Sequence, residues 1–270
     1  MNYTVKYLSL FRIRFINSLQ YRTAAFAGLF TNLVWGWMLV LAFAAFYRTA
    51  PEAFPMTFAQ TVTYIWLQQM IFIMVAVFLN DYDIVESIRD GAIAYEMVRP
   101  VDIYNKWFFQ LIAIRLSSML LRGVPTIIVA VFLPYPFGPS LPPDVFHFIG
   151  FLISIILTLC VVISFTLLMY ITAFYTMVFT GVQLVAIGLF FFLSGAIIPL
   201  PFFPESVQTV VQLLPFAAMH DIPLRIFSGH ITGVGIIHSI GLQFFWVCFL
   251  LLTGRIVMAN ALKRVIVQGG

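Results

Sequence analysis

Residues Ala24 to Phe46 read AAFAGLFTNLVWGWMLVLAFAAF, a run of 23 residues without a charged side chain. About 20 apolar helical residues are enough to cross the hydrocarbon core of a bilayer. A segment in lipid must satisfy its own backbone hydrogen bonds, so this run predicts a transmembrane helix. The composition agrees, because 62% of the 270 residues are hydrophobic and only 9% are charged. The sequence therefore predicts an all-α integral membrane protein.

Five more apolar runs follow the first one. They cover residues 58–79, 107–133, 145–170, 179–198 and 231–258. The run at 107–133 is broken by Arg115, Arg122 and Pro125, so we expect a long and internally polar third span. The six apolar runs predict six spans. Because no internal repeat or linker divides the chain, we expect these spans to form a single domain over residues 1–270.

The basic residues predict the orientation of these spans. Ten of them fall on one side of the predicted membrane: Lys6, Arg12, Arg14, Arg22, Arg89, Arg99, Lys106, Arg255, Lys263 and Arg264. Only Arg48 and Arg225 fall on the other side. Since basic residues gather in cytoplasmic segments, this bias predicts that both termini of the multi-pass protein lie in the cytoplasm. The same bias explains the net charge of +4 without a nucleic-acid partner.

Residues 1–22 have the pattern of an amphipathic helix. At 3.6 residues per turn, one arc is polar and the opposite side is apolar. The polar set is Lys6, Ser9, Asn17 and Gln20, and the apolar set is Leu8, Phe11, Phe15 and Leu19. We expect a helix that lies on the inner leaflet of the lipid bilayer.

Motifs for catalysis and cofactor binding are missing from the sequence. There is no GxxxxGK[ST] phosphate loop, no HExxH pair and no GxSxG elbow. We therefore expect no catalytic residue, no metal site and no cofactor on this chain; any ATP and Mg²⁺ bind to another protein. The histidines leave an external metal site as an alternative to interfacial hydrogen bonding. They are His147, His220, His230 and His238.

Arg115 and Arg122 lie inside the third predicted span. They are seven residues apart, or two helical turns, so they share a face. A charge in the middle of a bilayer costs about 2.5 to 3.5 kcal/mol and normally faces protein or water. Two interpretations stay open: the arginines line a cavity that attracts anionic groups, or both reach toward the inner headgroups.

The segment after the second span is unusually polar. Residues 84–102, IVESIRDGAIAYEMVRPVD, hold six of the 24 charged residues. Helical spacing places Ile84, Val85 and Ile88 on one face, and Asp83, Glu86 and Asp90 on another, before Gly91 interrupts the pattern. This predicts a short helix outside the membrane whose acidic surface and exposed isoleucines bind a soluble partner. The alternative is a solvated loop that joins two spans.

These features together resemble the permease subunits of type-2 ABC exporters over essentially the whole chain. The most specific motifs are IRDGAIAYEMVRP at residues 88–100 and SGAIIP at residues 194–199. The resemblance implies a coupling helix within residues 80–106 that seats in an ATPase subunit. The residues it assigns to this coupling are Asp83, Ile84, Val85, Glu86, Ile88, Arg89, Asp90, Gly91, Glu96, Arg99 and Pro100.

The resemblance also implies short re-entrant helices in residues 199–230, between the fifth and sixth spans. This segment carries five prolines from Pro199 to Pro223, too many for one crossing helix. Ser194, Gly195, Pro199 and Pro215 would help to close the pathway on the outer side.

The implied function is ATP-driven export of an amphiphilic substrate by alternating access. The implied assembly is a dimer of two permeases, identical or homologous, with two ATPase subunits that bind ATP and Mg²⁺. The alternative is a channel or secondary transporter that is not coupled to ATP. Because all ten acidic residues are expected in loops, the sequence disfavours ion-coupled transport. A membrane-embedded enzyme is disfavoured by the absence of a clustered catalytic set.

Overall fold

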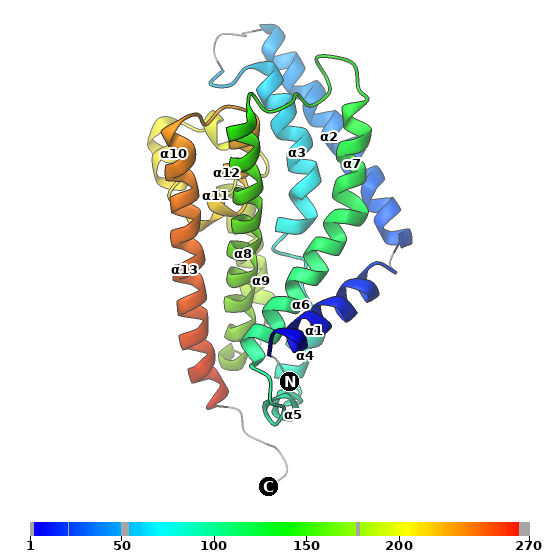
Figure 1. The fold of residues 1–270 in the computed structure, drawn as a ribbon. Coiled ribbons are helices and arrows are strands. Elements are labelled where there is room, and N and C mark those ends of the chain that lie inside the picture. The colour runs from blue at the N-terminus through cyan, green and yellow to red at the C-terminus, as the bar shows by residue number, and fades with distance from the viewer. Residues whose placement is uncertain (1–2, 21, 50–53, 177–178, 265–270) are drawn as a thin grey trace.

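A computed structural model describes residues 3–20, 22–49, 54–176 and 179–264, and these residues contain helices and no strands. Figure 1 shows an elongated bundle of long helices with shorter ones at both ends. The helical segments are α1 (Tyr3–Ser18), α2 (Arg22–Thr49), α3 (Phe58–Val75), α4 (Tyr82–Arg89), α5 (Ile93–Met97), α6 (Ile103–Ser118), the π-helix η2 (Met119–Gly123), α7 (Val124–Val131), α8 (Val145–Thr176), α9 (Phe179–Leu193), the 3₁₀-helix η3 (Leu200–Phe202), α10 (Glu205–Val211), α11 (Pro215–Met219), α12 (Asp221–Phe227) and α13 (Val234–Leu262).

Five helical stretches in the described residues are long and apolar enough to cross a membrane. They are Arg22–Thr49, Phe58–Val75, Ile103–Val131, Val145–Thr176 and Val234–Leu262. The prediction of an all-α membrane protein is therefore confirmed. The run at 179–198 forms a shorter helix than expected, because α9 ends at Leu193. Gly195 follows with a φ of +80°, a left-handed conformation that stops a helix.

The stretch Ile103–Val131 is continuous, but its middle turn is a π-helix. Pro125 lies in the first turn of α7, directly after the π-helix. Proline has no backbone N–H, so inside a regular α-helix it would remove one hydrogen bond of the ladder. At Gly123 the backbone of α3 comes so close that a Cβ atom would lie 1.9 Å from the carbonyl oxygen of Met70. The π-turn and this glycine together allow the third span to pack tightly against α3.

Helix α3 is the inner helix of the bundle. Its first turn is fixed by a capping box, in which Gln60 N–H donates to Thr57 Oγ1 and Thr57 N–H donates to Gln60 Oε1. Of its most apolar stretch 78% is buried, compared with 17% for α2. Helices α2, α7 and α12 all pack against α3, while α8 packs along α13. The uncovered face of α2 is left for lipid or for another protein.

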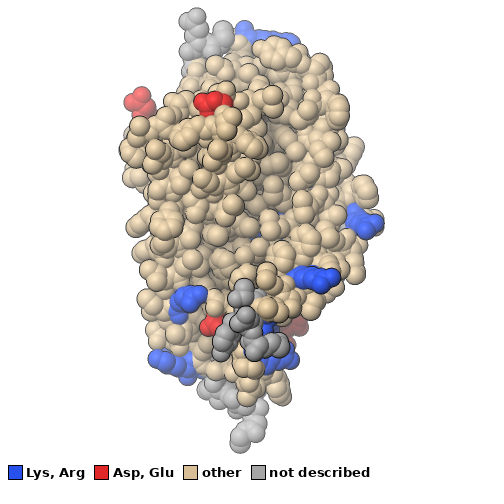
Figure 2. Space-filling model, viewed as in Figure 1, with Lys and Arg blue, Asp and Glu red and all other residues tan. Residues whose placement is uncertain are grey.

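The two ends of the bundle carry different elements. Figure 1 shows the start of α1 and the end of α13 at the lower end, together with α4 and α5, and the segment from α10 to α12 near the upper end. Figure 2 shows that most of the visible Lys and Arg side chains surround the lower end.

Helix α1 lies obliquely across the lower end and packs on α6 (Figure 1). The rings of Tyr7 and Phe109 stack with their centroids 5.5 Å apart. Leu8, which the sequence places on the apolar side of this helix, is exposed. Val5, Ile13 and Ile16 are exposed as well, so the outward face of α1 is apolar enough to contact lipid.

Candidate functional site

The isoleucines of α4 point into the protein. Ile84 and Ile88 are only 5% and 6% exposed, and both belong to the main hydrophobic core. The prediction that they are exposed for a partner is wrong. Their helix packs against α8 of the same chain, which covers its apolar face.

The outward side of this segment carries a different set of residues. Tyr95 and Val98 are 77% and 82% exposed, and Tyr82 is also exposed. We use the name α4–α5 surface for this exposed set: Tyr82, Asp83, Glu86, Arg89, Asp90, Tyr95, Val98, Arg99 and Pro100. It combines aromatic and apolar groups with charges of both signs, as protein interfaces do. Val85 and Glu86 also line a groove of about 390 Å³ that reaches Phe179.

The backbone turns sharply between α4 and α5 at Gly91, which has a φ of +74°. A residue with a side chain rarely adopts this conformation, so glycine is required there. Glu96 lies in α5 but is half-buried in an ion pair with Lys106. The motif at residues 88–100 therefore contains two kinds of residue: some face solvent, and others hold the segment in place.

Polar contacts at Asp81 anchor the start of α4. Its carboxylate accepts a hydrogen bond from Arg14 of α1, and its backbone N–H donates to Tyr170 Oη of α8 over 2.7 Å. Arg14 also contacts Asp83 at 3.1 Å. Burial raises the pKa of Asp81 above its usual value, and the charge of Arg14 opposes this shift only in part. These contacts connect the start of α4 to α1 and α8.

Arg115 is fully buried and satisfies the carbonyl groups at the end of α3. Its guanidinium donates to the carbonyl oxygens of Met74 (2.7 Å), Ala76 (3.0 Å) and Leu79 (3.4 Å), and to Thr166 Oγ1 of α8 (2.9 Å). Because these contacts keep the side chain inside the protein, it reaches neither a cavity nor the headgroups. Both interpretations from the sequence are wrong for Arg115.

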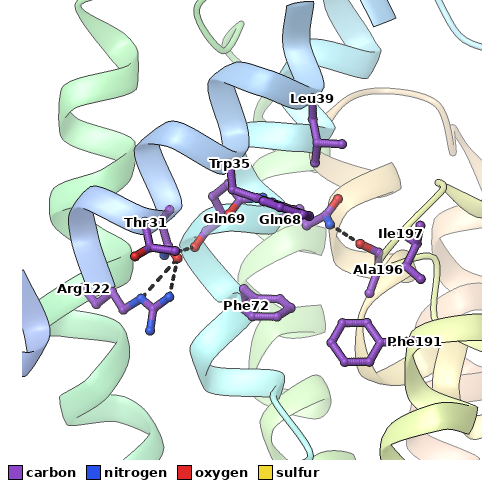
Figure 3. Close-up of a pocket in the computed structure, with 11 residues that line it drawn as sticks. Thr31, Trp35, Leu39, Gln68, Gln69, Phe72, Arg122, Phe191, Ala196 and Ile197 are labelled. Atoms are coloured by element: carbon purple, nitrogen blue, oxygen red, sulfur yellow. Dashed lines mark hydrogen bonds between the residues drawn. The ribbon is translucent and has the colours of Figure 1, made fainter. Parts of the chain in front are cut away.

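Arg122 does line a cavity, as one interpretation of the sequence held. It projects from η2 toward α2, where Nε and Nη2 donate to Asn32 Oδ1 over 3.1 and 2.6 Å. Asn32 in turn donates to the carbonyl oxygen of Gln69 in α3. Figure 3 shows Arg122 at one end of this space.

The cavity beside Arg122 lies between α2, α3, the end of α9 and the residues that follow it. Its volume is about 240 Å³. The lining consists of Thr31, Asn32, Trp35, Leu39, Gln68, Gln69, Phe72, Arg122, Phe191, Ala196 and Ile197. A mostly apolar wall with a few polar groups is typical of small-molecule sites.

A set of buried residues with polar contacts joins α3 to the segment after α9, and we call this set the upper cluster. It consists of Tyr64, Ser194, Gly195, His220 and Asp221. Tyr64 Oη donates to Asp221 Oδ1 over 3.0 Å and to Gly195 O over 3.4 Å, and His220 Nδ1 donates to Ser194 O over 3.1 Å. The structure thus places the adjacent residues Ser194 and Gly195 against Tyr64 of α3 and His220.

The other two residues expected in the outer closure have backbone roles. Pro199 precedes η3, and Pro215 begins α11. Asp221 corrects a further expectation, because it is fully buried rather than in an exposed loop. Arg225 pairs with it at 3.2 Å, so its charge is balanced within the chain. Among the described residues, no group of three or more His, Cys, Asp or Glu side chains could hold a metal ion.

Comparison of the sequence with known protein families identifies one family to which the chain belongs. Residues 33–269 match the family model described as ABC-2 family transporter protein. No curated protein sequence matches the chain. The match covers most of the chain, from within α2 to beyond α13, and includes the α4–α5 surface, the upper cluster and the cavity lining except Thr31 and Asn32. The chain therefore belongs to the ABC-2 transporter family and is a membrane-embedded permease subunit of that type.

Proposed function

We propose that this chain is the permease of an ATP-driven exporter in the cytoplasmic membrane, and that a separate ATPase subunit binds the α4–α5 surface. ATP and Mg²⁺ bind to that ATPase, and the permease moves an amphiphilic substrate by alternating access. The observation that carries the proposal is the two-sided character of α4. Its outer side offers charged and aromatic groups to a partner, whereas Ile84 and Ile88 fix its inner side to the core.

Contacts in the structure connect this surface to α3. Asp81 binds Tyr170 of α8, and Arg115 binds both Thr166 of α8 and the carbonyl groups at the end of α3. A displacement of α4 by the ATPase therefore moves α8 and the lower end of α3 together. Packed helices transmit such shifts because their interiors are dense and deform little.

The upper end of α3 takes part in the outer closure. Tyr64 and Gln68 of α3 donate hydrogen bonds to Asp221 and to Ala196 O. A movement of α3 breaks or forms these contacts at the end opposite the ATPase. This coupling supports alternating access, with the short helices α10, α11 and α12 as re-entrant elements of the outer gate.

A second permease, identical or homologous, completes the proposed assembly of two permeases and two ATPases. Helix α2 exposes Phe26, Phe30 and Val34, and α9 exposes Leu184 and Phe192. These apolar faces support contacts with lipid and with the second permease. The six spans of the proposal include α9 as the fifth, with the termini in the cytoplasm.

Charge reversal on the α4–α5 surface tests the proposal. We expect the double substitution Glu86→Arg and Asp90→Arg to abolish co-purification of the ATPase while the permease still inserts into the membrane. Glu205→Arg is a matched control, because Glu205 is exposed in α10 at the opposite end. Unchanged co-purification of the double variant would contradict the proposed docking site.

A further inference from the structure

The cavity beside Arg122 combines an apolar wall with one positive charge. The wall includes Trp35 of α2, Phe72 of α3 and Phe191 of α9. Figure 3 shows Arg122 at one end of the space, with Phe191 and Ile197 toward the other. A molecule that contacts both ends needs a polar group joined to an apolar body.

The charge of Arg122 is not balanced by the protein. No carboxylate of the described residues forms an ion pair with it. Nε and Nη2 share the neutral oxygen of Asn32, and Nη1 has no hydrogen-bond partner in the described part of the chain. A guanidinium binds a carboxylate or phosphate through two parallel hydrogen bonds, so the unused donors favour an anionic group.

A second unpaired group lies in the same cavity. Gln69 is 3% exposed, and its side-chain amide makes no hydrogen bond with any described residue. The amide is open to the cavity, so a bound molecule with oxygen atoms can replace water as its hydrogen-bond partner.

Local backbone features hold Arg122 in this position. A Cβ atom at Gly28 of α2 would lie 2.6 Å from Cδ of Arg122 and 2.7 Å from its Nε. A Cβ atom there would push the flexible end of the Arg122 side chain aside. Since π-turns are frequent at functional sites, the location of Arg122 in η2 agrees with a binding role.

We propose that this cavity binds an amphiphile with a single anionic group. A carboxylate or phosphate contacts Arg122, and the apolar body lies against Trp35, Phe72 and Phe191. A volume of about 240 Å³ is below the ~300 Å³ of small drug sites, so the cavity holds the headgroup and the first part of the chain. The same chemistry belongs to an exported cargo and to an anionic membrane lipid. Only the cargo assignment depends on the proposed function.

Binding of radiolabelled dodecanoate to the purified permease in phosphatidylcholine nanodiscs tests this inference. We expect Arg122→Gln to weaken dodecanoate binding by about tenfold or more, because it removes a charged hydrogen-bond donor. Gly28→Ala keeps the Arg122 side chain but shifts its guanidinium, so we expect dodecanoate to bind more weakly than to wild type. Arg48→Gln removes an exposed arginine of α2 and is the matched control. Labelled dodecylamine should bind no more tightly to wild type than to Arg122→Gln.

The two sources of the ligand give different results in one further measurement. If the bilayer provides the occupant, phosphatidylglycerol in the nanodiscs competes with dodecanoate; if cargo occupies the site, it does not. Equal dodecanoate affinity of wild type and Arg122→Gln, or equal binding of dodecanoate and dodecylamine, overturns the inference. The assay contains no ATPase, so failure of the proposed docking leaves its result unchanged.

Discussion

Changing Tyr64 to Phe removes one hydroxyl group from the upper cluster and leaves the ring in place. In the folded protein this hydroxyl donates to Asp221 Oδ1 over 3.0 Å, and both side chains are fully buried. Asp221 also pairs with Arg225 at 3.2 Å, so Tyr64 donates to a charged acceptor. A hydrogen bond to a charged group contributes about 1.5–3 kcal/mol. Neutral interhelical hydrogen bonds in a membrane protein average only about 0.6 kcal/mol.

A double-mutant cycle measures this interaction. The free energy of unfolding in mixed micelles is determined for wild type, Tyr64→Phe, Asp221→Asn and the double variant. The cycle subtracts the separate effect of leaving Arg225 without its carboxylate. We expect a coupling energy of about 1.5–3 kcal/mol between Tyr64 and Asp221.

The control for the cycle is Tyr135→Phe, the same chemical change at an exposed position, which should leave stability unchanged. A coupling energy at or below about 0.6 kcal/mol would refute the reasoning. It would mean that Asp221 is neutral or solvated and that the upper cluster does not hold α3 to the outer segment.

Two more predictions concern the lower end of the bundle. Ile88→Ala should lower the free energy of unfolding by about 2–5 kcal/mol, because it opens a cavity in the core. Tyr95→Ala should change stability by less than about 0.5 kcal/mol but weaken ATPase binding in a pull-down. If Ile88→Ala instead weakened ATPase binding without loss of stability, the isoleucines and not Tyr95 would form the interface. Because burial raises the pKa of Asp81, the folded state holds its proton more tightly than the unfolded state does. That contribution to stability is present below about pH 3.9 and is lost as pH rises through the folded-state pKa. Unfolding measured from pH 4 to 7 should show this loss in wild type and not in Asp81→Asn; an equal slope in both proteins would contradict it.

The sequence predicted the helical class well because an uncharged run in lipid has few structural options. It predicted where α4 would form, and it grouped Ile84 with Ile88 on one face. It could not predict which neighbour covers that face, since periodicity describes a helix and not its surroundings. Only the packing of α4 on α8 shows that Tyr95 and Val98, rather than the isoleucines, face outward.

The binding cavity and the upper cluster were harder to predict. Arg122 was noticed as a charge in an apolar run, but its partner Asn32 comes from a helix 90 residues earlier. One signal was present: Gly28, Asn32, Gly36 and Val40 recur at every fourth position and form the buried face of α2. Such a stripe indicates close helix packing. Tyr64 and Asp221 are 157 residues apart and have no local pattern that joins them.

The contacts of Arg115 also affect how the protein is made. Its acceptors belong to α3, which is synthesised before it, and to Thr166 of α8, which is synthesised after it. Until α8 is in the membrane, the guanidinium lacks one of its partners and one wall of its buried site. The third span should therefore be released into lipid late, together with the fourth. One buried arginine would then link the insertion of two neighbouring helices during translation.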